Sequence, residues 1–222
     1  MSRDALHDVT LNRNLLWNRA MKYLNLFLKR LIDLVGSGIG LIIISPFLII
    51  IALLIKTTSP GPVFFFQERL GKNGRVFKII KFRTMVVNAE KLGDGLRVKD
   101  DSDSRITKIG RFLRSTSLDE LPQLFNVFKG EMSLVGPRPP VPYHPYKYEE
   151  YTEEQRKRFT MRPGITGLSQ IRVRNSVSWD DRIVVDLKYI ESFSILLDIR
   201  ILFQTFFKLL RKEDIYLENR DC

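Results

Sequence analysis

An acidic pair, Asp119 and Glu120, lies in the stretch of this chain where side chains capable of chemistry are most concentrated. The pair belongs to the sequence SLDELPQL at residues 117–124, and the sequence LVGPRP follows at residues 134–139. The chain has only two histidines in 222 residues, too few and too dispersed for a histidine metal site, and it has no glycine-rich phosphate loop of the nucleotide-hydrolase type. The carboxylates are therefore the first candidates for any chemistry.

The backbone around this pair has two explanations. In the first, Ser117 and Glu120 form a capping box, and the motif is purely structural. In the second, a helix starts at Asp119, and Pro122 falls among the N–H groups that have no helical partner in any case. Pro122 favours the second, because in the first its missing N–H would cost a helical hydrogen bond. The carboxylates would then lie at a helix N-terminus, which favours an ionised Asp119 and tolerates phosphate.

Two strand-like runs precede the acidic stretch and are placed to support it. Residues 63–70 and residues 75–83 are rich in residues that favour strands and are separated by the sequence GKNG. An Asn-Gly pair between two such runs is a strong signal for a β-hairpin. The polar, glycine-containing segment that follows, residues 88–104, is expected to be a mobile loop.

Two further segments have the periodicity of amphipathic helices. In residues 106–113 apolar side chains recur at helical spacing with cationic side chains on another face, and residues 199–211 repeat the pattern with two phenylalanines in one turn. Each apolar face either packs on the domain core or lies among lipid headgroups. Both alternatives stay open at this point.

A run of 22 uncharged residues, 34–55, indicates that the chain enters a membrane. A straight helix of this length would reach about 33 Å, enough to cross a hydrocarbon core of about 30 Å. Pro46 argues against a straight crossing, because it removes a backbone donor and clashes with the carbonyl four residues earlier. The hydroxyl of Ser45 can bond to a carbonyl that the break leaves free. Ser45 and Pro46 therefore predict a break in the membrane helix.

Cationic residues flank this run on both sides, with Lys29 and Arg30 before it and Lys56 and Lys72 after it. Because such residues stay on the cytosolic face, a re-entrant hairpin satisfies both flanks, whereas a single span satisfies only one. We favour the re-entrant helix over a spanning helix with a tolerated kink, and both over a buried core helix, given the length of the run. The run is also too long for a signal-peptide core and is expected to persist in the mature protein.

The chain is strongly basic, with a formal net charge of +11, and residues 67–114 hold 13 Lys and Arg against 6 Asp and Glu. Such a field attracts anionic lipid headgroups, phosphorylated substrates or nucleic acid, and charge alone does not choose among them. The lone Cys222 allows no disulfide within the chain, which fits a reducing, cytosol-facing domain. We expect a basic amphipathic helix at residues 1–28, a re-entrant helix at residues 29–56 and a cytosolic catalytic domain at residues 57–222.

Four motifs in this order resemble the bacterial sugar transferases, the monotopic phosphoglycosyl transferases. They are KFRTM at residues 81–85, SLDELPQL at 117–124, LVGPRP at 134–139 and RPGITG at 162–167. Each alone is weak evidence, but together they span about residues 28–215 and are specific to the family. The resemblance implies a helix-rich α/β (α+β) fold with interfacial amphipathic helices around a small cytosolic domain. It also implies a re-entrant helix broken at a Ser-Pro pair, which Ser45 and Pro46 match.

The resemblance further implies an activity. Members of this family transfer a sugar-1-phosphate from a nucleotide diphosphate sugar, such as a UDP-sugar, to a polyprenol phosphate such as undecaprenyl phosphate. The reaction uses Mg²⁺, takes place at the cytosolic face of the bacterial inner membrane and initiates the synthesis of glycoconjugates such as exopolysaccharide, capsule, O-antigen or glycoprotein. The expected partners are thus the UDP-sugar, polyprenol phosphate and membrane lipids, with a homodimer left open and no nucleic acid.

The family's roles can be placed on matching positions. Asp119 matches the nucleophile, which would attack the sugar-proximal phosphorus and hold the phosphosugar covalently. Glu120 matches its acidic neighbour, and this pair suffices for Mg²⁺, which uses one or two carboxylates together with phosphate oxygens. Arg114 and Arg138 match arginines expected at the diphosphate. Weaker candidates are Lys81 and Arg83, for which a solvated strand face is an equal alternative, and then Gln123 and Thr166.

Two positions depart from the family pattern. Val173 stands where many relatives have glycine, and His144 stands where relatives with a Pro-Tyr-Glu sequence have glutamate. Both lie in the region expected to shape the choice of sugar. They therefore bear on the identity of the substrate and not on the reaction.

Two other classes of protein remain as alternatives. A basic, membrane-attached nucleic-acid binder would explain the charge, but no nucleic-acid module is recognisable and the acidic pair would have no purpose. A structural membrane anchor would explain the apolar helix alone. Within the enzyme class, the alternative to a covalent intermediate is direct transfer in a ternary complex, with Asp119 and Glu120 only holding Mg²⁺.

Overall fold

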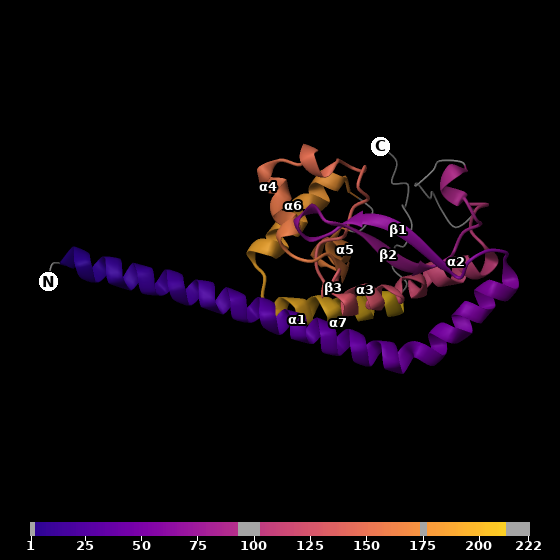
Figure 1. Ribbon diagram of the computed structural model, residues 1–222, viewed down its shortest axis with the longest axis horizontal. Coiled ribbons are helices and arrows are strands. Elements are labelled where there is room, and N and C mark those ends of the chain that lie inside the picture. The colour runs from indigo at the N-terminus through magenta and orange to yellow at the C-terminus, as the bar shows by residue number, and fades with distance from the viewer. Residues whose placement is uncertain (1–2, 93–102, 174–176, 212–222) are drawn as a thin grey trace.

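The computed structural model describes residues 3–92, 103–173 and 177–211. A long N-terminal helix runs along one side of a mixed, helix-rich α/β body (Figure 1). The predicted class of fold is confirmed at this level. Most of the loop predicted at residues 88–104 lies outside the described residues, which include only its two ends and a short 3₁₀ turn, η2 (Ala89–Lys91).

The long helix, α1 (Arg3–Thr58), is continuous, and its N-terminal part extends beyond the body (Figure 1). The boundary expected between residues 28 and 29 is not a break in this helix, and the division into parts there stays a prediction. By length and composition, the portion Tyr23–Thr58 could cross a membrane, with a mean hydropathy of 2.9 in a window of which 11% is buried.

The helix α1 bends as it passes along the body, and Pro46 is the one proline inside it (Figure 1). Sharp bends in helices usually occur at proline. Pro46 has no N–H to donate to the carbonyl of Ile42, four residues earlier. The hydroxyl of Ser45 donates to that same carbonyl over 2.9 Å. The predicted capping of a freed carbonyl by Ser45 is therefore confirmed. The predicted break is wrong, because the remaining hydrogen bonds carry α1 through Pro46 as one bent helix.

The predicted hairpin is present as two antiparallel strands, β1 (Phe64–Leu70) and β2 (Val76–Phe82). Its register sets Phe64 opposite Phe82 at one end and Leu70 opposite Val76 at the other. The 3₁₀ turn η1 (Lys72–Gly74) joins the strands, and Asn73 and Gly74 adopt left-handed φ angles of 55° and 73°. Asparagine and glycine are the residues that accept this conformation most readily.

Short helices and a second small sheet complete the body. The strands β3 (Ser133–Val135) and β4 (Gly164–Thr166) pair in parallel. The helical elements are α2 (Lys108–Ser115), η3 (Leu118–Glu120), α3 (Gln123–Lys129), η4 (Tyr148–Glu150), α4 (Glu153–Arg156), η5 (Lys157–Thr160), α5 (Leu168–Arg172), α6 (Trp179–Glu191) and α7 (Ile195–Arg211). The helices predicted near residues 106–113 and 199–211 are thus present as α2 and α7.

The part of α1 before the bend is fixed to the body by buried polar contacts. Lys29 forms an ion pair with Asp198 of α7, with 2.6 Å between Nζ and Oδ2, and also donates to the carbonyl of Val135 at 2.8 Å. Asp33 accepts a hydrogen bond from the backbone N–H of Leu134 at 2.9 Å. These contacts join α1 to both α7 and β3. Any other position of α1 would leave these buried charges unpaired, which is costly.

The part of α1 after the bend is fixed by apolar packing. Leu48, Ile51 and Ile55 form a buried cluster with Phe82 of β2 and Leu113 of α2. Burying a side chain of this size contributes about 1.5–3 kcal/mol. Both limbs of the bent helix therefore pack against the same body.

The helix α3 is hydrogen-bonded to the edge of β2 through one buried side chain, Asn126. Its Oδ1 accepts the N–H of Ile80 at 3.0 Å, and its Nδ2 donates to the carbonyl of Lys78 at 2.8 Å and to Glu131 at 2.7 Å. The amide thus takes the place of a neighbouring strand. This arrangement fixes the hairpin relative to α3.

Replacement of Asn126 by alanine should destabilise the protein. The N–H of Ile80 and the carbonyl of Lys78 would lose their partners, and each unsatisfied buried group costs about 1–3 kcal/mol. We expect a loss of about 2–4 kcal/mol in the free energy of unfolding, measured in nanodiscs by denaturant titration. Lys129→Ala, on an exposed position of the same helix, is the control and should change stability by less than about 0.5 kcal/mol. Equal stability of the two variants would show that the amide does not hold the hairpin.

Candidate active site

The acidic pair lies on a 3₁₀ turn, η3, which differs from both backbone arrangements considered for it. Ser117 has a left-handed φ of 56° and its side chain makes no capping hydrogen bond, so the capping box does not form. No α-helix starts at Asp119 either, because α3 begins at Gln123. Pro122 precedes that first residue, and its lack of an N–H costs no hydrogen bond, as the preferred alternative required.

Glu120 is held by cations from two other segments. The Nζ atom of Lys81, on β2, lies 2.6 Å from Oε1 of Glu120. A guanidinium nitrogen of Arg138 lies 3.8 Å from the same oxygen. The structure therefore brings Lys81 and Arg138 to the acidic pair, and the solvated strand alternative for Lys81 is wrong.

These cations determine the charge of Glu120. Burial alone would raise its pKa, but Lys81 and Arg138 outweigh burial, and with a smaller contribution from Arg69 they lower the pKa of Glu120 to about 2. An opposite charge within a few ångströms is expected to favour the ionised form in this way. Glu120 is thus ionised throughout the physiological range of pH.

Asp119 is in a different electrostatic position. Burial raises the pKa of Asp119 to about 6, Lys81 and Arg114 oppose this increase, and Glu120 adds to it. The residue is only 9% exposed, and in the described part of the chain the hydrogen bond to its carboxylate comes from its own backbone. At pH 7 this carboxylate is mostly ionised and more basic than an ordinary aspartate, which suits a nucleophile.

Two buried donors in the same stretch of the chain have no partner among the described residues. They are Nε of Arg114, in the last turn of α2, and Nε2 of Gln123, at the start of α3. Buried polar atoms are nearly always hydrogen-bonded, so these two donors in the stretch that carries the acidic pair suit an anionic ligand. Arg114 and Gln123 therefore stay candidates for binding phosphate.

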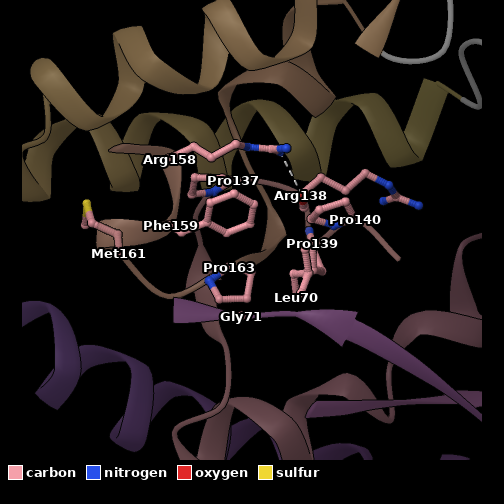
Figure 2. Close-up of a pocket in the computed structure, with 10 residues that line it drawn as sticks. All are labelled: Leu70, Gly71, Pro137, Arg138, Pro139, Pro140, Arg158, Phe159, Met161 and Pro163. Carbon is pink, nitrogen blue, oxygen red and sulfur yellow. Dashed lines mark hydrogen bonds between the residues drawn. The ribbon is translucent and has the colours of Figure 1, made fainter. Parts of the chain in front are cut away.

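The turn that carries Arg138 is packed against a small pocket, which Figure 2 shows. The buried side chain of Arg158 donates to the carbonyl of Arg138 at 3.0 Å, while the Arg138 side chain points away from Phe159 and Met161 in the pocket wall (Figure 2). The side chain of Arg138 is 37% exposed. The hydrogen bond from Arg158 thus holds the backbone of the turn, and the guanidinium of Arg138 is left available to a ligand.

Two of the predicted residues are not brought to the acidic pair. Arg83 donates to the carbonyls of Ser59 and Pro60. Its guanidinium packs so closely on Gly61, which has a φ of 119°, that a side chain would not fit at that position. The hydroxyl of Thr166 lies 2.7 Å from that of Thr205 on α7. Arg83 and Thr166 therefore connect elements of the fold, and their predicted contacts with substrate have no support in this geometry.

Arg69 was not predicted from the sequence, although it contributes to the site. It donates to the carbonyl of Pro139, at 3.0 Å, and it helps to lower the pKa of Glu120. Because side chains alternate along strands, the hairpin register places Arg69 on the same face as Lys81. The register of the predicted hairpin was therefore the signal that could have identified Arg69 from the sequence.

The two departures from the family pattern lie elsewhere. His144 is exposed and packs edge-on against Trp179, with 5.9 Å between the ring centroids. Val173 follows α5 and adjoins residues 174–176, which lie outside the described residues. Neither residue contacts the acidic pair in the described structure.

The acidic pair fits a magnesium ion only together with a ligand. Among the described residues no group of three or more His, Cys, Asp or Glu could hold a metal. Mg²⁺ commonly uses one or two carboxylates and completes its octahedron with phosphate oxygens and water. Asp119 and Glu120 therefore suit Mg²⁺ that arrives with a phosphate substrate.

Residues 24–212 match the model of a protein family described as "Bacterial sugar transferase". Because this match covers most of the chain, the protein belongs to the bacterial sugar transferase family. The resemblance inferred from the four sequence motifs is confirmed.

Several relatives are similar over most of this chain. The "Galactosyl transferase CpsE" of Streptococcus agalactiae serotype III is 45% identical over 83% of this chain and 42% of its own length. The "UDP-glucose:undecaprenyl-phosphate glucose-1-phosphate transferase" of Klebsiella pneumoniae is 44% identical over 87% of this chain and 42% of its own length. The chain thus spans less than half of these two proteins. It covers 94% of the "Exopolysaccharide production protein PSS" of Rhizobium leguminosarum bv. phaseoli, at 44% identity.

The pKa of Asp119 should depend on the charges of Glu120 and Lys81. In metal-free protein, infrared difference spectra against Asp119→Asn should show the protonated acid of Asp119 appearing between pH 7 and pH 5, because its pKa is raised to about 6. Glu120→Gln removes a negative neighbour and should lower this pKa by about 1 unit, whereas Lys81→Met removes a positive one and should raise it by a similar amount. A midpoint near 4 in the unaltered protein, or no response to either variant, would contradict this account.

Proposed function

We propose that this protein transfers a sugar-1-phosphate from a UDP-sugar to undecaprenyl phosphate and so initiates the synthesis of a membrane-bound glycoconjugate such as exopolysaccharide. The observation that carries the proposal is the arrangement of Asp119 and Glu120 beside Lys81 and Arg138. It combines a basic carboxylate with cations that suit a diphosphate. The names of the relatives support the same activity, since the Klebsiella pneumoniae protein is named for UDP-glucose and undecaprenyl phosphate.

In the first step, an Asp119 carboxylate oxygen attacks the sugar-proximal phosphorus of the UDP-sugar. The bond between this oxygen and phosphorus forms as the bond from phosphorus to the bridging oxygen breaks, and uridine monophosphate leaves. Arg138 and Arg114 bind the phosphate oxygens and balance their charge. Mg²⁺ bound by Asp119 and Glu120 with the substrate would supply further charge neutralisation at the diphosphate.

In the second step, a phosphate oxygen of the polyprenol phosphate attacks the same phosphorus. Its new bond displaces Asp119, which is regenerated as a carboxylate, and the product is a polyprenol diphosphate sugar. Lys81 keeps Glu120 ionised and fixed during both steps, because it lies 2.6 Å from it. The two displacements thus use one nucleophile from the protein, Asp119, and one from the acceptor.

We further propose that α1 enters the membrane as a re-entrant hairpin, with the body on the cytosolic face of the bacterial inner membrane. Support comes from the packing of both limbs of α1 against one body. Large apolar side chains are also exposed on α1, α2, α3 and α7, which lie along the same edge of the body (Figure 1). They include Ile42, Ile43, Phe112, Phe125, Phe128, Phe203, Phe206 and Phe207. Faces of this kind suit the headgroup region of a bilayer.

A covalent intermediate should be detectable when the acceptor is withheld. Protein in nanodiscs, given Mg²⁺ and UDP-sugar labelled in the sugar but no polyprenol phosphate, should release about one equivalent of uridine monophosphate and carry the label on the Asp119 peptide. A panel of UDP-sugars would identify the donor. Asp119→Asn should abolish both signals, because a neutral amide is a far poorer nucleophile, whereas Thr166→Val, which is remote from the pair, should retain them.

The competing mechanism has a distinct outcome. If transfer were direct, release of uridine monophosphate would require polyprenol phosphate and no label would appear on the protein. That result would overturn the role of Asp119 as nucleophile. It would leave the overall transfer reaction in place.

The topology can be tested by cysteine labelling in a Cys222→Ser background. Single cysteines introduced by Lys22→Cys and Lys72→Cys lie on opposite sides of the apolar run. If α1 is re-entrant, both should react with an impermeant maleimide only from the cytosolic side, in inverted vesicles and not in spheroplasts. Reaction of either cysteine from the periplasmic side would contradict the re-entrant arrangement.

A further inference from the structure

Two arginines pack near one aromatic ring, that of Trp179 at the start of α6, and among the described residues only one of them forms an ion pair. The guanidinium carbons of Arg158 and Arg182 lie 6.0 Å and 5.1 Å from the centre of this ring. Arg158 is 1% exposed and forms a 2.6 Å ion pair with Asp186, whose side chain is equally buried. The charge of Arg158 is therefore neutralised within the protein.

The charge of Arg182 is not neutralised in this way. Its one hydrogen bond among the described residues is a long one, 3.3 Å to the carbonyl of Val177, and its Nε is buried without a partner. Asp186 accepts hydrogen bonds from Arg158 and Ser169, at 2.6 and 2.7 Å, and makes none with Arg182 among the described residues. A guanidinium remains protonated in proteins, so Arg182 is a cation with no direct ion pair among the described residues, and Asp186 acts on its charge only from a distance.

Arg182 also lies close to the cation that reaches the acidic pair. Arg158 connects the two, because it contacts both the ring of Trp179 and, at 3.0 Å, the carbonyl of Arg138. Burial lowers the pKa of Arg182, repulsion from Arg138 lowers it further, and the charge of Asp186 opposes both effects. An anion bound between Arg182 and Arg138 would relieve this repulsion and would give the orphaned Nε of Arg182 a partner.

We propose that Arg182 and Arg138 together bind a phosphate group of a substrate. The guanidinium of Arg182 is packed against Trp179, so it is already oriented and loses little freedom on binding. Identifying the phosphate as a substrate's rests on the proposed function, and two sources share this chemistry. They are the UDP-sugar and the polyprenol phosphate.

The anion site can be tested without turnover, with inorganic pyrophosphate as the probe and no Mg²⁺ present. Binding to the protein in nanodiscs is measured by the pyrophosphate dependence of the thermal unfolding midpoint. Arg182→Gln should weaken binding by about tenfold, since a partly buried charged partner is lost. Lys188→Gln, the same charge change at an exposed position of α6, is the matched control and should bind like the unaltered protein.

A second variant keeps the test valid if Arg182→Gln lowers stability. Arg182→Lys retains the charge and can still contact Trp179 but loses the planar fork, so weaker binding is expected here too. Binding in both Arg182 variants that stays within about twofold of the control would overturn the proposal, as would an absence of pyrophosphate binding to the unaltered protein.

Steady-state kinetics of the same variants then assign the source of the phosphate. A fall of kcat/KM for the UDP-sugar alone places Arg182 at the nucleotide, and a fall for the polyprenol phosphate alone places it at the lipid. An equal fall for both places it at the transferred phosphate, which both half-reactions share. Unchanged values for both substrates would overturn the proposal. A protein that binds pyrophosphate through Arg182 but transfers no sugar would refute the proposed function and leave the anion site standing.

Discussion

The ion pair between Lys81 and Glu120 is the contact on which the arrangement of the site depends. Two adjacent carboxylates in a largely buried turn repel one another. Without a nearby cation, one of them would take up a proton to reduce this repulsion. Lys81 places its positive charge 2.6 Å from Glu120, so the proton affinity is divided unequally between the two acids. Glu120 stays charged, while Asp119 becomes the more basic of the two. One adjacent pair thereby contains two chemically different groups, a fixed anion and a more basic carboxylate.

The geometry of that ion pair depends on the relative position of the turn that carries Glu120 and the strand that carries Lys81. The helix α3 connects these two elements. At its N-terminal end α3 follows the turn with the acidic pair, and in its middle Asn126 bonds to the strand that carries Lys81. At its C-terminal end, Arg30 of α1 donates to the carbonyls of Val127 and Phe128 at 2.8 and 3.0 Å. A cation at this end also interacts favourably with the helix dipole. The helix α1 and the hairpin are therefore both attached to one short helix, so a shift of α1 would be transmitted to the turn that carries Asp119 and Glu120.

Local signals in the sequence predicted the parts of this structure that local chemistry determines. The GKNG turn predicted the hairpin, and the adjacent Ser45 and Pro46 predicted the capped carbonyl, because in each case the interacting groups are within a few residues of one another. The break expected at Pro46 is a bend in a continuous helix. The pairing of Lys81 with Glu120 joins residues 39 apart and follows from the packing of α3 on β2, for which no periodicity gives a signal. The 3₁₀ turn escaped prediction for a similar reason, since the left-handed Ser117 ends α2 in a way that propensities do not indicate. Resemblance to the family located the acidic pair, but it did not separate Lys81, which reaches the pair, from Arg83, which binds backbone carbonyls instead.

The bend in α1 has two independent physical causes, one local and one tertiary. Proline inside a helix costs about 3 kcal/mol or more, and Ser45 offsets part of that cost through its bond to the carbonyl of Ile42. The body adds a second cause, because Lys29 is bound before the bend and Leu48 packs after it, and a straight helix directed along either limb would carry the other away from the surface it contacts. Releasing the second limb would expose three buried aliphatic side chains at about 1.5–3 kcal/mol each, which exceeds the cost of the proline. The bent form is thus favoured by the packing of the body as well as by the sequence at the bend, and this packing keeps the apolar apex of α1 on the same edge of the molecule as α7.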